Sequence, residues 1–212
     1  MIKDIVAETV ALELLKIGAI KIRPVNPFTW ASGWKSPIYC DNRLALSYPD
    51  IRVLIKNALT ENVEKNFPNV EAIAGVATAG IPQGVLIADK LNLPFLYVRP
   101  KPKEHGLANL IEGEIIKGQK IVVIEDLIST GGSSLKSVEA LQAAEINVLG
   151  MVAIFTYGFA ESTLNFKARN ISLYALSNYN TLIDVAIKNN FIKKEEELSL
   201  KSWRENPSVW GK

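Results

Sequence analysis

Between residues 71 and 190, short apolar runs alternate with segments of helical periodicity. The apolar runs cover residues 71–77, 94–99, 120–127, 146–157 and 171–177, and they are apolar nearly throughout instead of at every second position. This pattern is typical of strands that are buried on both faces. Because parallel strands need long crossover connections, the intervening helical segments favour parallel pairing. The order predicts an α/β fold with a central, mostly parallel sheet flanked by helices.

The regions on either side of this alternation are less regular. Residues 2–17 have a helical pattern, and residues 48–66 have another with Pro49 near its start. Residues 27–43 combine turn residues with aromatic side chains and have no helical period, which predicts an irregular or short-stranded appendage. A polar helix is expected at 193–203.

The near-neutral net charge argues against a nucleic-acid or membrane partner. The chain has 24 Lys and Arg against 22 Asp and Glu, a net charge of +2, so we expect neither a nucleic-acid nor a membrane partner. Cys40 is the only cysteine, which excludes a disulfide framework within the chain and favours a reducing cytoplasm. Acidic residues within the apolar pattern of the N-terminal segment predict an amphipathic helix, not a signal peptide.

The run 120–127 ends in two adjacent acids, Glu125 and Asp126, and a turn rich in hydroxyl groups and glycine follows. In open parallel sheets, ligands bind at the carboxyl ends of the strands. The first amide groups of the next helix have no partners within that helix, and glycines let a backbone approach a ligand closely. The turn therefore suits a monophosphate, with hydroxyl donors from Ser129, Thr130, Ser133 and Ser134. A capped helix N-terminus is the alternative.

The paired acids favour the phosphate interpretation. Two adjacent carboxylates repel each other, and neither can bind an anion. They can accept hydrogen bonds from vicinal hydroxyl groups, as an acidic residue does with ribose in dinucleotide sites. A phosphate turn below such acids suits a ribose 5-phosphate. The turn has no lysine after its glycines and no G-x-G-x-x-G pattern, which excludes a P-loop and a dinucleotide fingerprint.

Two further segments could bind anions or could be purely structural. Thr78, Ala79 and Gly80 follow a predicted strand and precede a helix, so their amide groups could face another anion or simply form a tight turn. A cluster of cations between residues 99 and 105 is either a solvated basic loop or a site for anions. It consists of Arg99, Lys101, Lys103 and His105, the only histidine.

Residues 122–134, V-V-I-E-D-L-I-S-T-G-G-S-S, resemble the 5-phosphoribosyl 1-diphosphate (PRPP) signature of type I phosphoribosyltransferases. The resemblance implies that Glu125 and Asp126 hold the ribose hydroxyl groups and that the turn holds the 5′-phosphate. It assigns residues 78–80 to the pyrophosphate. The residues that it assigns to PRPP are Thr78, Ala79, Gly80, Arg99, Lys103, His105, Glu125, Asp126, Leu127, Ile128, Ser129, Thr130, Gly131, Gly132 and Ser133.

Two segments resemble the orotate phosphoribosyltransferases within that family. R-P-K-P-K-E-H-G, residues 99–106, is similar to their mobile catalytic loop, with Pro100 where some members have lysine. The resemblance implies a homodimer in which the loop 99–113 reaches the pyrophosphate in the neighbouring subunit. The resemblance further implies that Lys103, His105 and Asp126 are the catalytic residues of the enzyme.

F-T-W-A-S-G-W-K-S-P, residues 28–37, is similar to the hood of these enzymes, with Ala31 where some members have lysine. The resemblance implies that Lys35, Tyr39 and Ser129 bind orotate. The chain 1–212 would then form a single phosphoribosyltransferase domain in which roughly residues 19–45 contribute to the hood over the base.

The implied reaction converts orotate and PRPP to orotidine 5′-monophosphate and pyrophosphate, in pyrimidine (UMP) biosynthesis. Mg²⁺ would be bound through the diphosphate, with few direct protein ligands and no metal site of the protein's own. Two other functions share the PRPP turn. One is a phosphoribosyltransferase for another base, and the other is a PRPP-binding regulator of the same fold.

Overall fold

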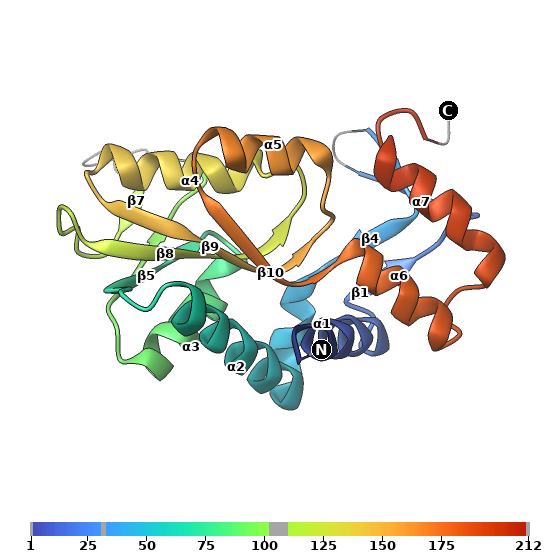
Figure 1. Ribbon diagram of the computed structural model, residues 1–212, viewed down its shortest axis with the longest axis horizontal. Helices are drawn as coiled ribbons and strands as arrows, with labels where there is room; N and C mark the ends of the chain where they lie inside the picture. The colour runs from blue at the N-terminus through green and yellow to red at the C-terminus, as the bar shows by residue number, and fades with distance from the viewer. Residues whose placement is uncertain (1, 31–32, 102–109, 211–212) are drawn as a thin grey trace.

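A six-stranded sheet forms the centre of the computed structural model, which describes residues 2–30, 33–101 and 110–210 (Figure 1). Its strand order is β10-β9-β8-β5-β6-β7, and only β7 runs antiparallel to its neighbour. The strands are β5 (Ala72–Val76), β6 (Phe95–Val98), β7 (Ile111–Glu112), β8 (Lys120–Ile128), β9 (Asn147–Thr156) and β10 (Ser172–Asn178). The predicted α/β fold with a mostly parallel sheet is confirmed.

Helices cover both faces of the sheet. Figure 1 shows α4 (Gly132–Ala143) and α5 (Ala160–Ala168) on one side, and α1 (Ile2–Lys16), α2 (Pro49–Asn66) and α3 (Gly80–Leu91) on the other. The central strand β8 shows why both faces must be covered, because its side chains alternate between the two layers. Ile121 and Val123 pack in the cluster with α4, whereas Val122 and Ile124 pack in the cluster with α1 to α3.

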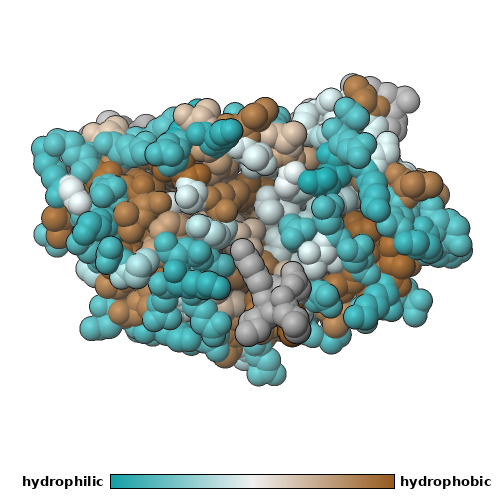
Figure 2. Space-filling model, in the orientation of Figure 1, coloured by the Kyte–Doolittle hydropathy of each residue, from teal (hydrophilic) through white to brown (hydrophobic). Residues whose placement is uncertain are grey.

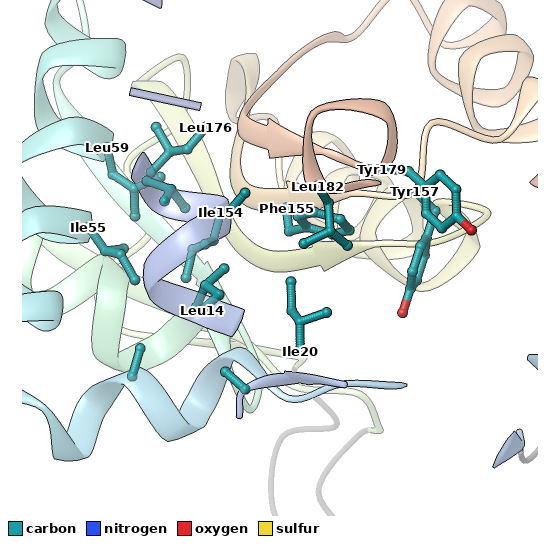
Figure 3. Packing of buried hydrophobic residues seen from close by; sticks show 14 of the residues in the cluster. Leu14, Ile20, Ile55, Leu59, Ile154, Phe155, Tyr157, Leu176, Tyr179 and Leu182 are labelled. Carbon is teal, nitrogen blue, oxygen red and sulfur yellow. The ribbon is translucent and has the colours of Figure 1, made fainter. Parts of the chain in front are cut away.

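The larger core lies between the sheet and α1, α2 and α6 (Tyr179–Lys188). Figure 3 shows side chains from distant parts of the chain meeting there. They include Leu14, Ile55, Leu59, Ile154, Phe155, Leu176 and Leu182. Burial of these aliphatic and aromatic side chains fixes α1 and α6 against the strands β9 and β10.

The short-stranded appendage predicted at residues 27–43 is part of a longer run of short strands that begins at Ile20. This run contains β1 (Ile20–Ile22), β2 (Phe28–Thr29), β3 (Lys35–Ser36) and β4 (Ile38–Cys40), and it leads into the 3₁₀ helix η1 (Asn42–Ser47). β1 pairs with β4 and β2 pairs with β3, both antiparallel. We call residues 19–45 the hood from here on.

The structure differs from the sequence-based prediction at α5, at β7 and in the C-terminal helix. The helix α5 and the short strand β7 were missed. The predicted polar helix at 193–203 consists of η2 (Lys194–Glu196) followed by α7 (Glu197–Glu205). It is also not polar on all sides, because Leu200 and Trp203 of α7 are fully buried. Both side chains lie on one stripe of the helix, three positions apart.

The surface is mixed in character. Figure 2 shows apolar residues gathered along the β10 edge of the sheet, with hydrophilic residues around them. Within the described ranges, no helix combines the length and the hydropathy needed to cross a bilayer.

Candidate active site

The predicted phosphate-binding and sugar-binding segments meet at the carboxyl ends of the parallel strands. β5, β6 and β8 are parallel neighbours, so the segments that follow them lie side by side at their carboxyl ends. Gly80, at the start of α3, is packed so closely that a Cβ there would lie 2.4 Å from the carbonyl oxygen of Ile124. The turn Thr78–Gly80 therefore lies directly against the strand residue that precedes Glu125, and the Ala77–Thr78 peptide bond is cis.

Glu125 is almost completely buried at the end of β8, with 6% of its surface exposed. One carboxyl oxygen accepts a hydrogen bond from the Asp126 amide at 3.0 Å, and the other accepts one from the Ser134 hydroxyl at 2.9 Å. We expected Ser134 to be a donor to phosphate. In the structure it is a buried residue of α4 whose hydroxyl is used by Glu125.

Asp126 is more exposed than Glu125 and is held through its main chain. Its carbonyl oxygen accepts a hydrogen bond from the Asn42 side-chain amide at 2.8 Å. The oxygen of the same Asn42 side chain accepts a hydrogen bond from the Cys40 thiol at 3.2 Å. Burial raises the pKa of that thiol, so it stays protonated and can donate. The hood is thereby connected directly to the acid-bearing strand.

The pKa values of both acids are raised, and the causes differ in part. Burial, helped by the neighbouring charge of Asp126, raises the pKa of Glu125 to about 8. Burial also raises the pKa of Asp126, but its hydrogen bond with Glu125 and the charge of Arg43 oppose that shift. Glu125 therefore holds a proton far more strongly than an ordinary carboxyl group, and Asp126 is the more exposed acid of the pair.

The predicted phosphate turn opens α4 and is supported by α5. Gly131 has φ +81°, and a Cβ there would lie 2.7 Å from the Phe166 ring. The side-chain amide of Asn165 donates a hydrogen bond to the Thr130 carbonyl at 3.1 Å. In contrast, Gly132 is exposed, and a Cβ there would meet only the Thr130 hydroxyl, at 3.9 Å. Gly131 is thus needed by the fold, whereas Gly132 leaves the turn open to a ligand.

The two ends of the predicted catalytic loop adjoin each other at the far edge of the sheet. Val98 pairs with Ile111, and the Arg99 amide donates to the Leu110 carbonyl at 2.8 Å. The Arg99 guanidinium lies 3.4 Å from the carboxylate of Glu112. Lys103 and His105 lie outside the described residues, so their predicted roles rest on the sequence.

The predicted orotate residues of the hood are both exposed to solvent. Tyr39 is 42% exposed, and its ring lies 5.6 Å from the Phe28 ring. Lys35 is exposed and donates a hydrogen bond to the Thr29 hydroxyl at 2.9 Å. Ala31, where some family members have lysine, lies outside the described residues. Ser129, the third predicted orotate residue, is half-buried and follows Asp126 by three positions in the chain.

Comparison with known proteins identifies the family. The phosphoribosyl transferase domain family matches residues 46–185. The orotate phosphoribosyltransferase of Cytophaga hutchinsonii is 61% identical over 203 residues, covering 96% of this chain and 97% of that protein. The chain belongs to the orotate phosphoribosyltransferase family. The Bacteroides fragilis member is 56% identical over 200 residues, with 94% of both chains covered.

Solved structures agree with this family. The crystal structure of orotate phosphoribosyltransferase from Aeropyrum pernix has a TM-score of 0.75 and 29% identity, and covers 87% of this chain and 99% of that chain. The resemblance on which the sequence analysis relied is thereby confirmed. The matched domain begins at residue 46, so the hood and everything after residue 185 lie outside it.

Several site residues could not have been found from the sequence. Asn42 and Asn165 are single polar residues outside any motif, and nothing in their neighbours predicts that they bond to strand and turn carbonyls. A weak signal did exist for α5, because Glu161 near its start and Lys167 near its end match the helix dipole.

The buried carboxyl group of Glu125 predicts a specific pH dependence of stability. The unfolded chain releases this proton near the ordinary pKa of 4.5, whereas the folded chain holds it up to about pH 8. The folded state therefore binds more protons in that window, and the free energy of unfolding falls as pH rises from about 4.5 to about 8. In Glu125→Gln this component disappears. We expect its stability relative to the unsubstituted protein to rise by on the order of 2–5 kcal/mol across the window.

Urea unfolding at a series of pH values measures this difference. Glu161→Gln, at an exposed acid of α5, is the matched control and should follow the unsubstituted protein. If the Glu125→Gln curve runs parallel to that of the unsubstituted protein, Glu125 is ionised in the folded state.

The two glycines of the turn predict different outcomes. Gly131→Ala should destabilise the fold by about 1–3 kcal/mol, because it adds a Cβ against Phe166 at positive φ. Gly132→Val meets open space and should fold normally, but it should weaken ribose 5-phosphate binding at least about tenfold by blocking the turn. Thermal unfolding and calorimetric titration separate the effects. Unchanged affinity in Gly132→Val would show that the turn is only a helix cap.

Proposed function

We propose that this protein transfers the ribose 5-phosphate group of PRPP to orotate, giving orotidine 5′-monophosphate and pyrophosphate, in pyrimidine biosynthesis. The carrying observation is the end of β8, where the accessible acid Asp126 and the buried acid Glu125 directly precede an open phosphate turn. The high identity to orotate phosphoribosyltransferases supports orotate as the base. The cytoplasmic location that the single cysteine favours stays a prediction.

The charges of the site suit this chemistry. Breaking the bond at C1′ leaves positive charge on the ribose, as in other displacements through an oxocarbenium-like state. The carboxylate of Asp126 can stabilise that charge, while protonated Glu125 can hold a hydroxyl group without adding a second full charge. Residues Leu127 to Ser133 would then hold the 5′-phosphate at the start of α4.

Pyrophosphate leaves with growing negative charge and needs cations. Arg99, Lys103 and His105 would supply them, together with the amide groups of the turn Thr78–Gly80. Arg99 lies 3.4 Å from Glu112, so reaching a phosphate requires that it exchange one anionic partner for another. Closure of the loop 99–113 would also exclude water from the reacting centre.

Mg²⁺ is proposed as the cofactor and would neutralise part of the diphosphate charge. Within the described ranges, no three His, Cys, Asp or Glu side chains gather into a metal site. Mg²⁺ is commonly held by one or two carboxylates together with substrate phosphates, and Asp126 is a partly exposed carboxylate at the site. The donor set therefore fits an ion carried by the diphosphate with few protein ligands.

The base is proposed to lie between the hood and the end of β8. Tyr39 and Lys35 would contact orotate from the hood, and Ser129 from the turn. The hydrogen bond from Asn42 to the Asp126 carbonyl supports this arrangement, because it connects the segment after β4 to the residue beside the ribose. The chain 1–212 then acts as one catalytic domain.

A homodimer is proposed because the loop 99–113 is expected to act in the neighbouring subunit. Exposed apolar side chains on neighbouring elements support such an assembly. They are Leu44, Tyr48, Val53 and Val85, which are 38–45% exposed and lie on η1, α2 and α3 or at their ends. In this part of the fold η1 contacts α2, and α2 contacts α3.

Absorbance of orotate tests the proposed function. With PRPP and Mg²⁺ present, the orotate absorbance should decrease over time at a rate proportional to the enzyme concentration. Uracil, adenine and hypoxanthine should react at least about a hundredfold more slowly. Turnover of another base in place of orotate would reassign the substrate. Binding of PRPP without turnover of any base would indicate a regulator of the same fold.

Mixtures of two inactive variants test the proposed dimer. Lys103→Ala removes a loop cation, and Asp126→Asn removes the charge beside the ribose. If the loop acts across the dimer, a mixed dimer contains one intact site, built from the intact loop of one chain and the intact ribose site of the other. Half of randomly paired dimers are mixed and each has one of two sites, so activity should recover to about a quarter of the unsubstituted level.

Native mass spectrometry should verify that mixed dimers have formed before activity is measured. Verified mixed dimers that show no more than the residual activity of the parents would place the loop in its own subunit.

A further inference from the structure

The hood cannot hold its own shape. Its two antiparallel pairs, β1 with β4 and β2 with β3, have strands of only three and two residues. An isolated two-stranded hairpin of ordinary length is already marginal in water. Contacts from elsewhere in the chain must therefore fix the hood.

The indole ring of Trp203 supplies much of that contact. Trp203 lies on α7 and is fully buried. Its ring centroid lies 5.6 Å from that of Trp30 in the hood, 5.7 Å from Tyr157 and 5.5 Å from Phe159. Tyr179, at the start of α6, lies 5.4 Å away. Aromatic pairs at these separations are favourable beyond their burial. One ring of α7 thus joins the hood to the segment after β9.

Hydrogen bonds make the same connection. The Trp203 indole N–H donates to the Lys35 carbonyl oxygen at 3.1 Å. The neighbouring Arg204 donates from Nε to the Tyr157 carbonyl at 3.2 Å and from Nη2 to the Gly158 carbonyl at 2.9 Å. Because the guanidinium is a charged and planar donor, these bonds fix direction as well as distance. Lys35 is one of the two hood residues proposed to contact the base.

α7 is itself firmly attached. Leu200 is fully buried, and its carbonyl oxygen accepts a hydrogen bond from the Tyr179 hydroxyl at 3.0 Å. Within the helical segment itself, Glu197 forms an ion pair with Lys201 at 2.7 Å and another with Lys194, which stabilise the start of α7. The helix lies outside the segment 46–185 that matches the family domain. The hood lies outside that segment as well, so this contact joins two parts of the chain that flank the matched domain.

We propose that α7 positions the base-binding hood, with Trp203 and Arg204 as the positioning residues. The inference rests on the proposed function, in which the hood covers orotate. The PRPP residues lie on β8, α4, the turn after β5 and the loop after β6. The hydrogen bond of Trp203 runs to Lys35 in the hood. The bonds of Arg204 run to the carbonyl oxygens of Tyr157 and Gly158, and the Tyr157 amide in turn donates to the Ile128 carbonyl at 3.0 Å. Because the Trp203 contact runs to the hood and not to a PRPP residue, loosening α7 should weaken orotate binding more than PRPP binding.

Steady-state kinetics of two substituted full-length proteins test this positioning role. Trp203→Phe keeps a buried ring but removes the bond to Lys35, and Arg204→Met keeps the alkyl stem but removes both carbonyl bonds. Each should raise the KM for orotate about tenfold, while the PRPP dissociation constant, measured by calorimetry without orotate, stays within about twofold. Arg204→Lys, which keeps a cationic donor, should recover part of the loss.

Arg169→Met is the matched control. Arg169 is also an arginine with a short Nε hydrogen bond, to Glu139 at 2.7 Å, but it joins α5 to α4 on the other side of the sheet. It should leave the KM for orotate unchanged.

Two outcomes would overturn the proposal. One is an unchanged KM for orotate in both variants, or in Arg204→Met alone if Trp203→Phe does not fold. The other is a lower melting temperature with a reduced kcat and no change in KM, which indicates a purely structural helix. In both cases the unsubstituted protein still converts orotate, so the proposed function stands. A protein that does not convert orotate at all overturns the proposed function as well.

Discussion

The buried carboxyl group of Glu125 is the constraint around which this site is arranged. An ionised carboxylate at such a position would be costly, because burial removes the water that stabilises its charge. The fold meets that cost with a retained proton, the Ser134 hydroxyl and the Asp126 amide. The hydrogen bond from Ser134 also ties the first turn of α4 to β8. Strand, acid pair and phosphate turn consequently form one rigid unit.

The site is built from two parts of the molecule, the sheet and the hood. The sheet edge holds the sugar and phosphate segments at the ends of β5, β6 and β8, where parallel pairing brings them together. The hood is a separate layer of very short strands, attached through Asn42 to β8 and through Trp203 to α7. Rigid strand ends suit recognition of a constant ribose phosphate, whereas a hood that depends on added contacts can vary with the base.

Much of the fold could be predicted because it depends on local periodicity. The five buried runs became β5, β6, β8, β9 and β10, and the predicted helices before, between and after them became α1, α2, α3, α4 and α6. The failures have a common cause. β7 has only two residues and α5 has a weak apolar stripe, so neither has a period long enough to recognise. The helix at 193–203 was expected, but not that its Trp203 would be fully buried, since burial depends on what packs against it.

The sequence by itself determined which chemical groups this protein offers and in what order: two acids, a glycine-containing turn, a cationic loop and a short aromatic hood. These follow from covalent neighbours and from motifs within a few residues. Only the tertiary structure decided that Glu125 keeps a proton while Asp126 faces the site, that Ser134 is used by Glu125, and that Gly131 serves the fold while Gly132 leaves the turn open. Burial and hydrogen bonding depend on residues far away in the chain, and adjacent residues of the same type become different only when the fold places different neighbours around them.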